Sequence, residues 1–138
     1  SPYMRTPKRI ARVAILTMWC LALPAAAYAV NVSSSDGSGT QSRTTTYNNG
    51  AVVSGNLKST AGYPVYYQGR VDWPQWYCSD STVGRYSTDT TSTSAVTRGG
   101  TIAATPGAGC SSAGVLSKVC RNKPNLTPDS CGSWSTKY

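Results

Sequence analysis

The stretch Pro64-Val-Tyr-Tyr-Gln-Gly-Arg-Val-Asp-Trp73 decides the fold class of this chain. Apolar and polar side chains alternate along it, and a period of two is the repeat of a β-strand with one buried and one exposed face. We therefore predict a strand over 64–73. The inward set is Val65, Tyr67, Val71 and Trp73, and the outward set is Tyr66, Gln68, Arg70 and Asp72. Gly69 falls in the inward register, where the missing side chain indicates a bulge.

Shorter stretches on both sides of this strand have the same character. They are rich in Val, Thr and Tyr, which favour strands, and Gly, Pro and Asn turns separate them. The Asn-Asn-Gly sequence at 48–50 predicts a hairpin turn. The other predicted strands cover 42–47, 51–54, 76–78, 83–86, 88–97, 101–105 and 115–120, the last being a strand or a single helical turn. The predicted fold is all-β, a small antiparallel β-sandwich or barrel stabilised by disulfides and preceded by a signal-peptide helix.

The first 29 residues have the three parts of a secretory signal peptide in order. Basic residues precede an apolar run over 13–23, which we expect to be helical, and Ala27-Tyr28-Ala29 forms a small-residue cleavage motif. We predict cleavage between Ala29 and Val30. The run is shorter than the roughly 20 residues that a membrane span needs, and Pro24 ends it. We therefore expect no membrane span in the mature form.

These features divide the chain into three segments. Residues 1–29 are the predicted signal peptide, in which Ser1–Tyr3 precede Met4 and are expected not to be native. Residues 30–41 are rich in Ser and Gly, which predicts a flexible linker. Residues 42–138 are expected to form a single β-rich domain with disulfides. The predicted location is secreted or periplasmic.

The composition of the mature part predicts a thin core. Of the 109 residues after the signal, 33 are Ser or Thr, whereas Leu, Ile and Val number only 14 and Phe is absent. Tyr and Trp must then fill much of the interior. Four of the 13 basic residues leave with the signal while all five aspartates remain, so the formal charge falls from +8 to +4. A mild positive charge without a Lys/Arg cluster does not indicate nucleic-acid binding.

Four cysteines remain after cleavage: Cys78, Cys110, Cys120 and Cys131. An even number of cysteines in an exported domain predicts two disulfides, for which three connectivities are possible. We favour Cys78–Cys110 with Cys120–Cys131, because this pairing closes one long and one local loop. Each bridge is worth about 2–4 kcal/mol, which is a large contribution for a domain with so few aliphatic residues.

The residue types that carry most enzyme catalysis are missing. The chain has no His and no Glu, which excludes the usual Ser-His-Asp and Cys-His arrangements. It contains no S-x-x-K, G-x-S-x-G or P-loop motif, and its cysteines lack the spacing of a zinc site. A paired-carboxylate hydrolase would have to use Asp72 with Asp80 or Asp89, which equally fit strand faces and turns. We therefore expect no enzymatic activity, no cofactor and no metal.

Six aromatic residues gather within fifteen positions, from Tyr63 to Tyr77. Such side chains either fill the core or present flat faces to a sugar, peptide or protein. The alternation assigns Tyr67 and Trp73 to the core. The residues left as candidates for ligand contact are Tyr66, Arg70, Trp76 and Tyr77.

These observations predict an exported, non-enzymatic β domain that binds an extracellular glycan or protein, or has a structural role at a surface. A small cationic toxin is one alternative, because positive charge and disulfides fit that class, although no basic amphipathic face is visible. A hydrolase inhibitor is another, with the cysteine-tethered stretch 118–131 as its loop.

Overall fold

The structure, a computed structural model, describes residues 29–47, 50–104 and 106–138. The predicted signal peptide, except Ala29, and its helix lie outside these residues, as do two of the three residues of the predicted turn at 48–50.

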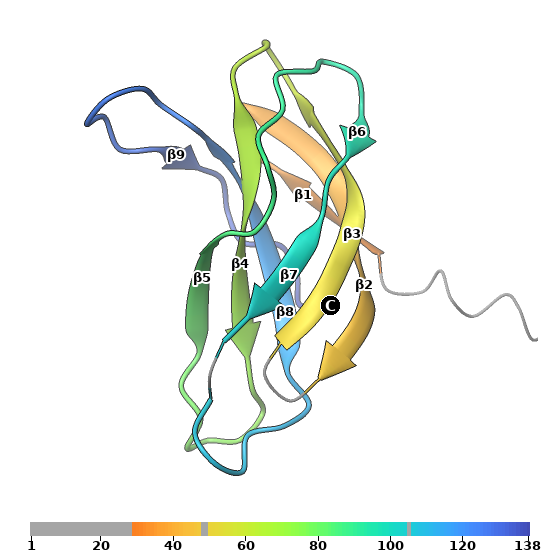
Figure 1. Ribbon diagram of the computed structural model, residues 1–138, viewed down its shortest axis with the longest axis vertical. Helices are drawn as coiled ribbons and strands as arrows, with labels where there is room; N and C mark the ends of the chain where they lie inside the picture. The colour runs from red at the N-terminus through yellow and green to blue at the C-terminus, as the bar shows by residue number, and fades with distance from the viewer. Residues whose placement is uncertain (1–28, 48–49, 105) are drawn as a thin grey trace, which may run out of the picture.

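The described residues form an all-β fold in which no helix occurs and the strands lie in two antiparallel sheets (Figure 1). The strands of the first sheet are β1 (Ala29–Ser33), β2 (Gly37–Tyr47), β3 (Gly50–Ser59), β6 (Val96–Thr97) and β7 (Gly100–Ala103). Their order is β1-β2-β3-β6, and β7 also pairs with β3. The strands of the second sheet are β4 (Val65–Asp72), β5 (Ser81–Arg85), β8 (Gly114–Arg121) and β9 (Ser130–Cys131). Their order is β5-β4-β8-β9.

The deciding strand forms, but two residues of its predicted outward set, Tyr66 and Asp72, are also buried. All four members of its inward set are buried, and the pairing of β4 with β5 shifts register between Gln68 and Gly69, which confirms the bulge. The missing side chain at Gly69 also has a packing role. A Cβ there would lie 2.9 Å from the side chain of Ile102 on β7, so the glycine allows the two sheets to approach closely.

Residues of both sheets fill the interior. The larger buried cluster joins Ala51, Val53 and Ile102 of the first sheet to Val71 and Val115 of the second. The smaller cluster is built in the same way around Tyr67. Aromatic rings thus supply the volume that aliphatic residues do not, as the composition predicts.

Hydroxyl groups accompany those rings into the interior, and they need hydrogen-bond partners there. The Tyr86 hydroxyl donates to Gln41 Oε1 at 3.0 Å and lies 2.8 Å from Ser117 Oγ, which is 2.6 Å from the Tyr138 hydroxyl. The Tyr67 ring stacks on Tyr86 with centroids 5.7 Å apart, and its hydroxyl donates to the backbone oxygen of Asn56 at 2.6 Å. The core is therefore held by a polar network as well as by apolar contact.

The prediction of a flexible linker over 30–41 is wrong. This segment forms most of β1 and the first part of β2, which pair in register around a tight turn. Ser34 N–H donates to Gly37 O at 2.8 Å, and Asp36 N–H donates to Ser34 Oγ at 3.2 Å. Val32 enters the core and Val30 packs against it, so these two valines attach β1 to the core although most of the segment consists of small residues.

One further predicted strand is absent, and another forms only in part. Residues 76–78 form a turn, because Pro74 ends β4 and the chain must reverse. Residues 88–97 contribute only β6 and a single bridge between Thr90 and Val65. Within that segment Ser92 N–H donates to Thr90 Oγ1, and Ser94 N–H donates to Ser92 Oγ. Such local bonds compete with pairing between strands.

The disulfides have the favoured connectivity, Cys78–Cys110 and Cys120–Cys131. After β9 the C-terminal segment, residues 132–138, continues along β8. Gly132 N–H donates to Val119 O, and Tyr138 and Val115 exchange a pair of backbone hydrogen bonds. The tail therefore covers the edge of the second sheet with Tyr138 buried, which the sequence did not indicate.

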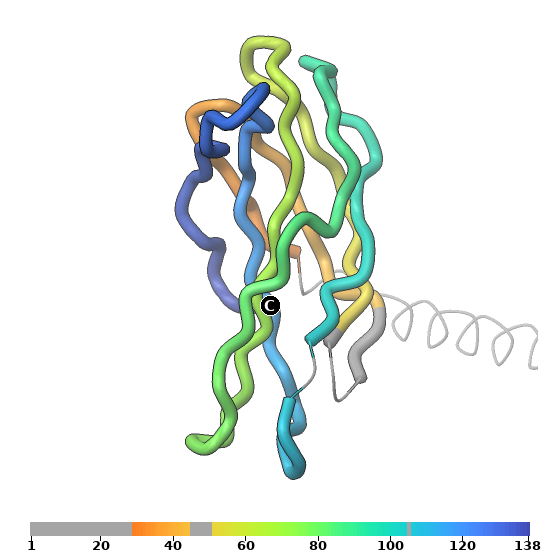
Figure 2. Tube along the Cα trace, turned by 60° about the vertical axis from the view of Figure 1, so that its left-hand side comes forward, coloured from red at the N-terminus to blue at the C-terminus, as the bar shows by residue number. Residues whose placement is uncertain are grey.

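Loops gather at the two ends of an elongated molecule (Figure 2). At one end the β3–β4 loop meets the β1–β2 turn and the β8–β9 loop, through bonds from Thr60 N–H to Asp36 O and from Asn122 N–H to Pro64 O. At the other end Cys78–Cys110 joins the β4–β5 loop to the β7–β8 loop.

Candidate functional site

The β4–β5 loop carries the most exposed aromatic side chain among the described residues. We call residues 74–77 the Trp76 tip. Trp73 is still buried, Pro74 then stops the pairing of the strand, and Trp76 is 94% exposed while Tyr77 is 53% exposed. Burying an indole of this size would contribute on the order of 5 kcal/mol. Trp76 and Tyr77 are adjacent and both exposed, so together they form an aromatic patch of the kind that marks a contact surface.

The loop is anchored on both sides of Trp76. The Gln75 amide donates to Ser111 Oγ at 3.2 Å, and its carbonyl oxygen accepts from Ser111 N–H at 3.2 Å. The Tyr77 hydroxyl donates to Gly109 O at 2.9 Å. The next residue, Cys78, forms the disulfide to the β7–β8 loop. A backbone fixed in this way loses little conformational entropy when it binds.

The two aromatic rings of the tip stand at right angles. The centroids of Trp76 and Tyr77 are 5.7 Å apart, with an interplanar angle of 86°. Gly109, with φ of +82°, lies directly against the Tyr77 hydroxyl and supplies a backbone conformation that side chains rarely adopt. The Trp76 tip therefore presents two perpendicular aromatic rings and does not form a flat platform.

The other two predicted contact residues are not exposed parts of the Trp76 tip. Tyr66 is only 3% exposed: its hydroxyl donates to Asp129 Oδ2 at 2.5 Å and the Arg85 guanidinium covers its ring at 3.9 Å from the centroid. Burial, followed by the bond to Asp129, raises the pKa of Tyr66, and the same bond lowers the pKa of Asp129. Tyr66 therefore does not join Trp76 in one patch.

Arg70 stabilises the loop that carries the Trp76 tip, through ion pairs with two aspartates. Its Nε lies 2.7 Å from Asp72 Oδ1, and one terminal nitrogen lies 2.6 Å from Asp80 Oδ2. The hydrogen bonds to Asp72 and then Asp80 raise the pKa of the guanidinium. Because Asp80 lies where the loop returns towards β5, this pairing ties both ends of the loop together. The guanidinium also lies between the Asp72 and Asp80 carboxylates. A paired-carboxylate hydrolase would need that space for the glycosidic bond.

Asp89, the other carboxylate considered, lies in a separate cluster. It accepts from Arg85 at 2.6 Å and from the Asn122 amide at 2.8 Å. Within the described ranges, no three His, Cys, Asp or Glu side chains come close enough to hold a metal ion. No helix in the same part of the chain is long and apolar enough to cross a membrane.

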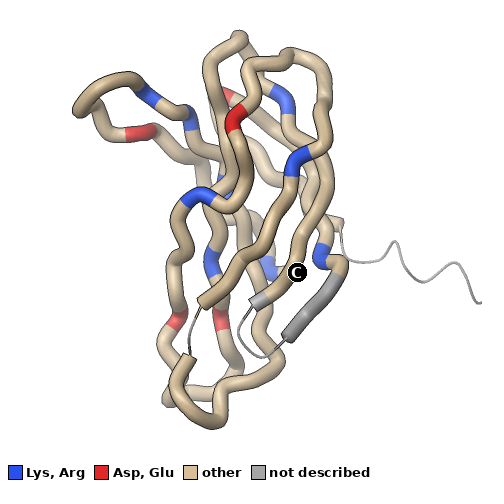
Figure 3. The backbone as a smooth tube through the Cα atoms, viewed as in Figure 1, with Lys and Arg blue, Asp and Glu red and all other residues tan. Residues whose placement is uncertain are grey.

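The basic residues are spread over both sheets in the middle and upper parts of the molecule, and the lower loops carry none (Figure 3). Arg70, Arg85 and Arg121 each lie beside an aspartate. Among the described residues, this arrangement leaves no broad face of a single charge.

The all-β, disulfide-bonded fold is thus the class that the structure defines. No protein-family model matches the chain, and no curated protein or solved structure matches it either.

Sequence reasoning missed one exposed residue. Leu126 is 99% exposed in the loop that Cys120–Cys131 closes. Its setting between Pro124 and Pro128 was the available signal, because a leucine between two prolines in a short cysteine-closed loop has little chance to reach the core.

Proposed function

We propose that this protein is an exported, non-enzymatic binding domain that contacts its partner through the Trp76 tip. The observation that carries this proposal is a 94%-exposed tryptophan on a loop fixed by a disulfide and side-chain hydrogen bonds. Trp and Tyr are the residues that dominate the energy of interfaces. The absence of His and Glu from the chain supports a role without catalysis.

The shape of the tip favours a protein partner. A sugar chain packs best on coplanar aromatic faces, whereas Trp76 and Tyr77 are perpendicular. An exposed aromatic side chain on a rigid loop, such as Trp76, instead fits an apolar pocket on another protein. Binding would bury both rings and leave Arg70 in its present role of holding the loop.

A β-sandwich is the arrangement that we propose for the two sheets. Two separate hydrogen-bonded sheets and core clusters shared between them support a sandwich over a barrel. The two disulfides are consistent with an oxidising location outside the cytoplasm, and the sequence of residues 1–29 supports export.

The test is capture by the processed protein from the extracellular fraction of its source. Wild type, Trp76→Ala and Leu126→Ala are immobilised in parallel, and the recovered proteins are compared. Leu126→Ala is the matched control, because it removes an equally exposed apolar side chain at the other end of the molecule. The proposal requires a protein that wild type and Leu126→Ala recover and Trp76→Ala does not.

Leu126 supports a second candidate, inhibition of an extracellular protease. The loop that contains it is closed at its base by Cys120–Cys131 and braced by a bond from Lys123 N–H to Asp129 Oδ1 at 3.0 Å. A rigid loop with one exposed apolar side chain can enter a protease specificity pocket. Titration of serine proteases with wild type and Leu126→Gly distinguishes this function, since only wild type would then inhibit.

A further inference from the structure

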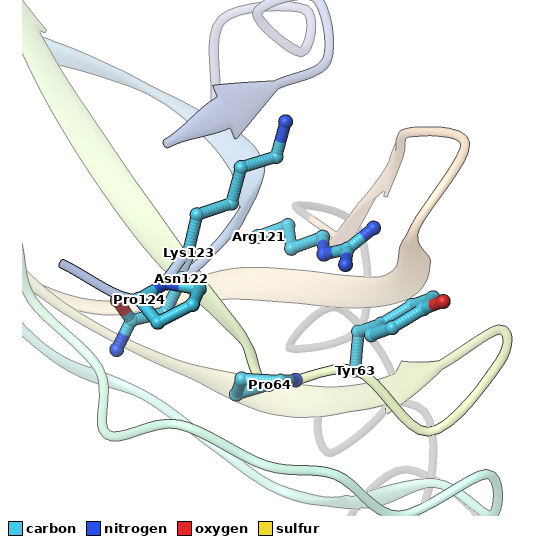
Figure 4. A pocket seen from close by; sticks show the side chains of 6 residues that line it. All are labelled: Tyr63, Pro64, Arg121, Asn122, Lys123 and Pro124. Carbon is cyan, nitrogen blue, oxygen red and sulfur yellow. The ribbon is translucent and has the colours of Figure 1, made fainter. Parts of the chain in front are cut away.

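A hollow of about 470 Å³ lies between the β3–β4 and β8–β9 loops (Figure 4). Its lining residues are Tyr63, Pro64, Arg121, Asn122, Lys123 and Pro124. Tyr63 and Pro64 precede the eight residues of β4, whereas the Trp76 tip follows them. At about 3.3 Å per residue the two regions are about 25 Å apart, so the hollow is distinct from the tip.

The loops that form the hollow are fixed before any ligand arrives. Asn122 N–H donates to Pro64 O at 2.8 Å and joins the two loops directly. Ser59 Oγ donates to Tyr63 O at 2.7 Å, and the Asn122 amide donates to Asp89. The Cys120–Cys131 disulfide lies immediately before Arg121. Such preorganisation lowers the entropy lost on binding.

The charged side chains that line the hollow, Arg121 and Lys123, are positive, while Asp36, Asp89 and Asp129 contact lining residues from outside it. The Arg121 guanidinium carbon lies 3.4 Å from the centroid of the Tyr63 ring, and its contact with Asp36 is long, at 3.8 Å. A guanidinium has five N–H donors, so most of them remain for a ligand. In the described part of the chain the Lys123 ammonium forms no salt bridge and no carboxylate lines the hollow, but Asp129 accepts from the Lys123 backbone N–H at 3.0 Å and interacts electrostatically with Lys123.

We propose that this hollow binds an anionic saccharide, a sugar ring that carries a carboxylate or a sulfate. Arg121 covers one face of the Tyr63 ring, so the rest of that ring, which is 45% exposed, and the rings of Pro64 and Pro124 offer apolar surface for the C–H face of a sugar. Arg121 and Lys123 offer charge-assisted hydrogen bonds to its acidic group. A bare inorganic anion would make no use of the apolar faces, and a neutral sugar would make no use of the two cations.

Titration of the full processed protein with three tetrasaccharides tests the proposal. A heparin-derived tetrasaccharide supplies sulfate, tetragalacturonate supplies carboxylate alone, and maltotetraose is neutral. We expect saturable binding of at least one anionic probe and no binding of maltotetraose. Binding is monitored through the NMR chemical shifts of Tyr63 and Asn122. Binding of tetraglutamate with equal affinity would overturn the saccharide assignment.

Variants separate the hollow from general charge attraction. Arg121→Ala and Lys123→Ala should each weaken binding about tenfold or more, as expected for loss of a charge-assisted hydrogen bond. Tyr63→Ala should weaken it without changing the charge. Lys58→Ala removes one positive charge from β3, outside the hollow, and Trp76→Ala alters the other end; both should bind as wild type. An equal loss in Lys58→Ala, or no binding of either anionic probe, would overturn the proposal.

Discussion

Tyr86 is the residue at which the composition of this protein has its clearest energetic consequence. A phenylalanine would fill the same volume, but the tyrosine carries a hydroxyl that must be satisfied inside the core. Gln41 and Ser117 satisfy it, and both are fully buried. The ring stacks on Tyr67, so the polar contacts and the packing depend on the same side chain.

The variant Tyr86→Phe is expected to lower the free energy of unfolding by about 1–3 kcal/mol, because it leaves a buried Gln41 oxygen without its donor. Tyr77→Phe is the matched control: it removes a hydroxyl bonded to Gly109 O on a half-exposed ring, and we expect a change within about 0.5 kcal/mol. Urea unfolding of the two variants measures the difference. Equal losses would mean that the buried network contributes nothing specific.

At the scale of elements, β4 shows what a sequence pattern can and cannot predict. Its alternation predicted the buried face and the bulge at Gly69, because both follow from the geometry of one strand. The hydrophobic pattern could not predict that 29–33 forms the strand β1 or that the tail runs along β8. Both segments pair through their peptide groups, whatever the side chains are. Trp76 was found from its place after Pro74, whereas the burial of Tyr66 depends on Asp129, which is 63 positions away.

Gly69→Ala is expected to destabilise the protein by about 1–3 kcal/mol, as overpacking of a filled core does. The added methyl would lie 2.9–3.0 Å from three atoms of Ile102 across the interface between the sheets. Gly84→Ala on the neighbouring strand β5 meets nothing within 4 Å and should be neutral or slightly stabilising. Thermal unfolding compares the two, and equal melting temperatures would contradict the close approach of the sheets.

Deletion of residues 133–138 is expected to cost about 3 kcal/mol or more, comparable to the loss of a large core aromatic. The deletion removes the buried Tyr138 and exposes the edge of β8. An open edge favours association between chains. Chemical denaturation and sedimentation measure both effects, and a monomer as stable as wild type would show that the tail is dispensable.

For the whole molecule, three buried tyrosines link stability to alkaline pH. Burial is the main cause that raises the pKa of Tyr67, Tyr86 and Tyr138. In the unfolded chain a tyrosine ionises near pH 10. Above that pH the unfolded state loses protons that the folded state retains. The free energy of unfolding is therefore at its full value below about pH 10 and falls as the pH rises further.

The expected slope is about 1.4 kcal/mol per pH unit for each tyrosine that stays protonated in the folded protein, or up to about 4 for the three together. Urea unfolding at about pH 9 and about pH 11 measures this loss. Tyrosinate absorbance should appear together with unfolding for these three rings. A free energy of unfolding that is constant across this range would contradict their burial as neutral groups.

At one end of the molecule lies the exposed Trp76 tip, and at the other lies the hollow lined by Arg121 and Lys123. In the proposed function, the Trp76 tip makes the contact with a protein partner. The most direct test of this claim is the affinity of the captured partner for wild type and for Trp76→Ala, measured by titration calorimetry on folded protein. Loss of a hot-spot tryptophan predicts an affinity lower by about 30-fold or more, equivalent to 2 kcal/mol or above. An unchanged affinity would contradict the claim.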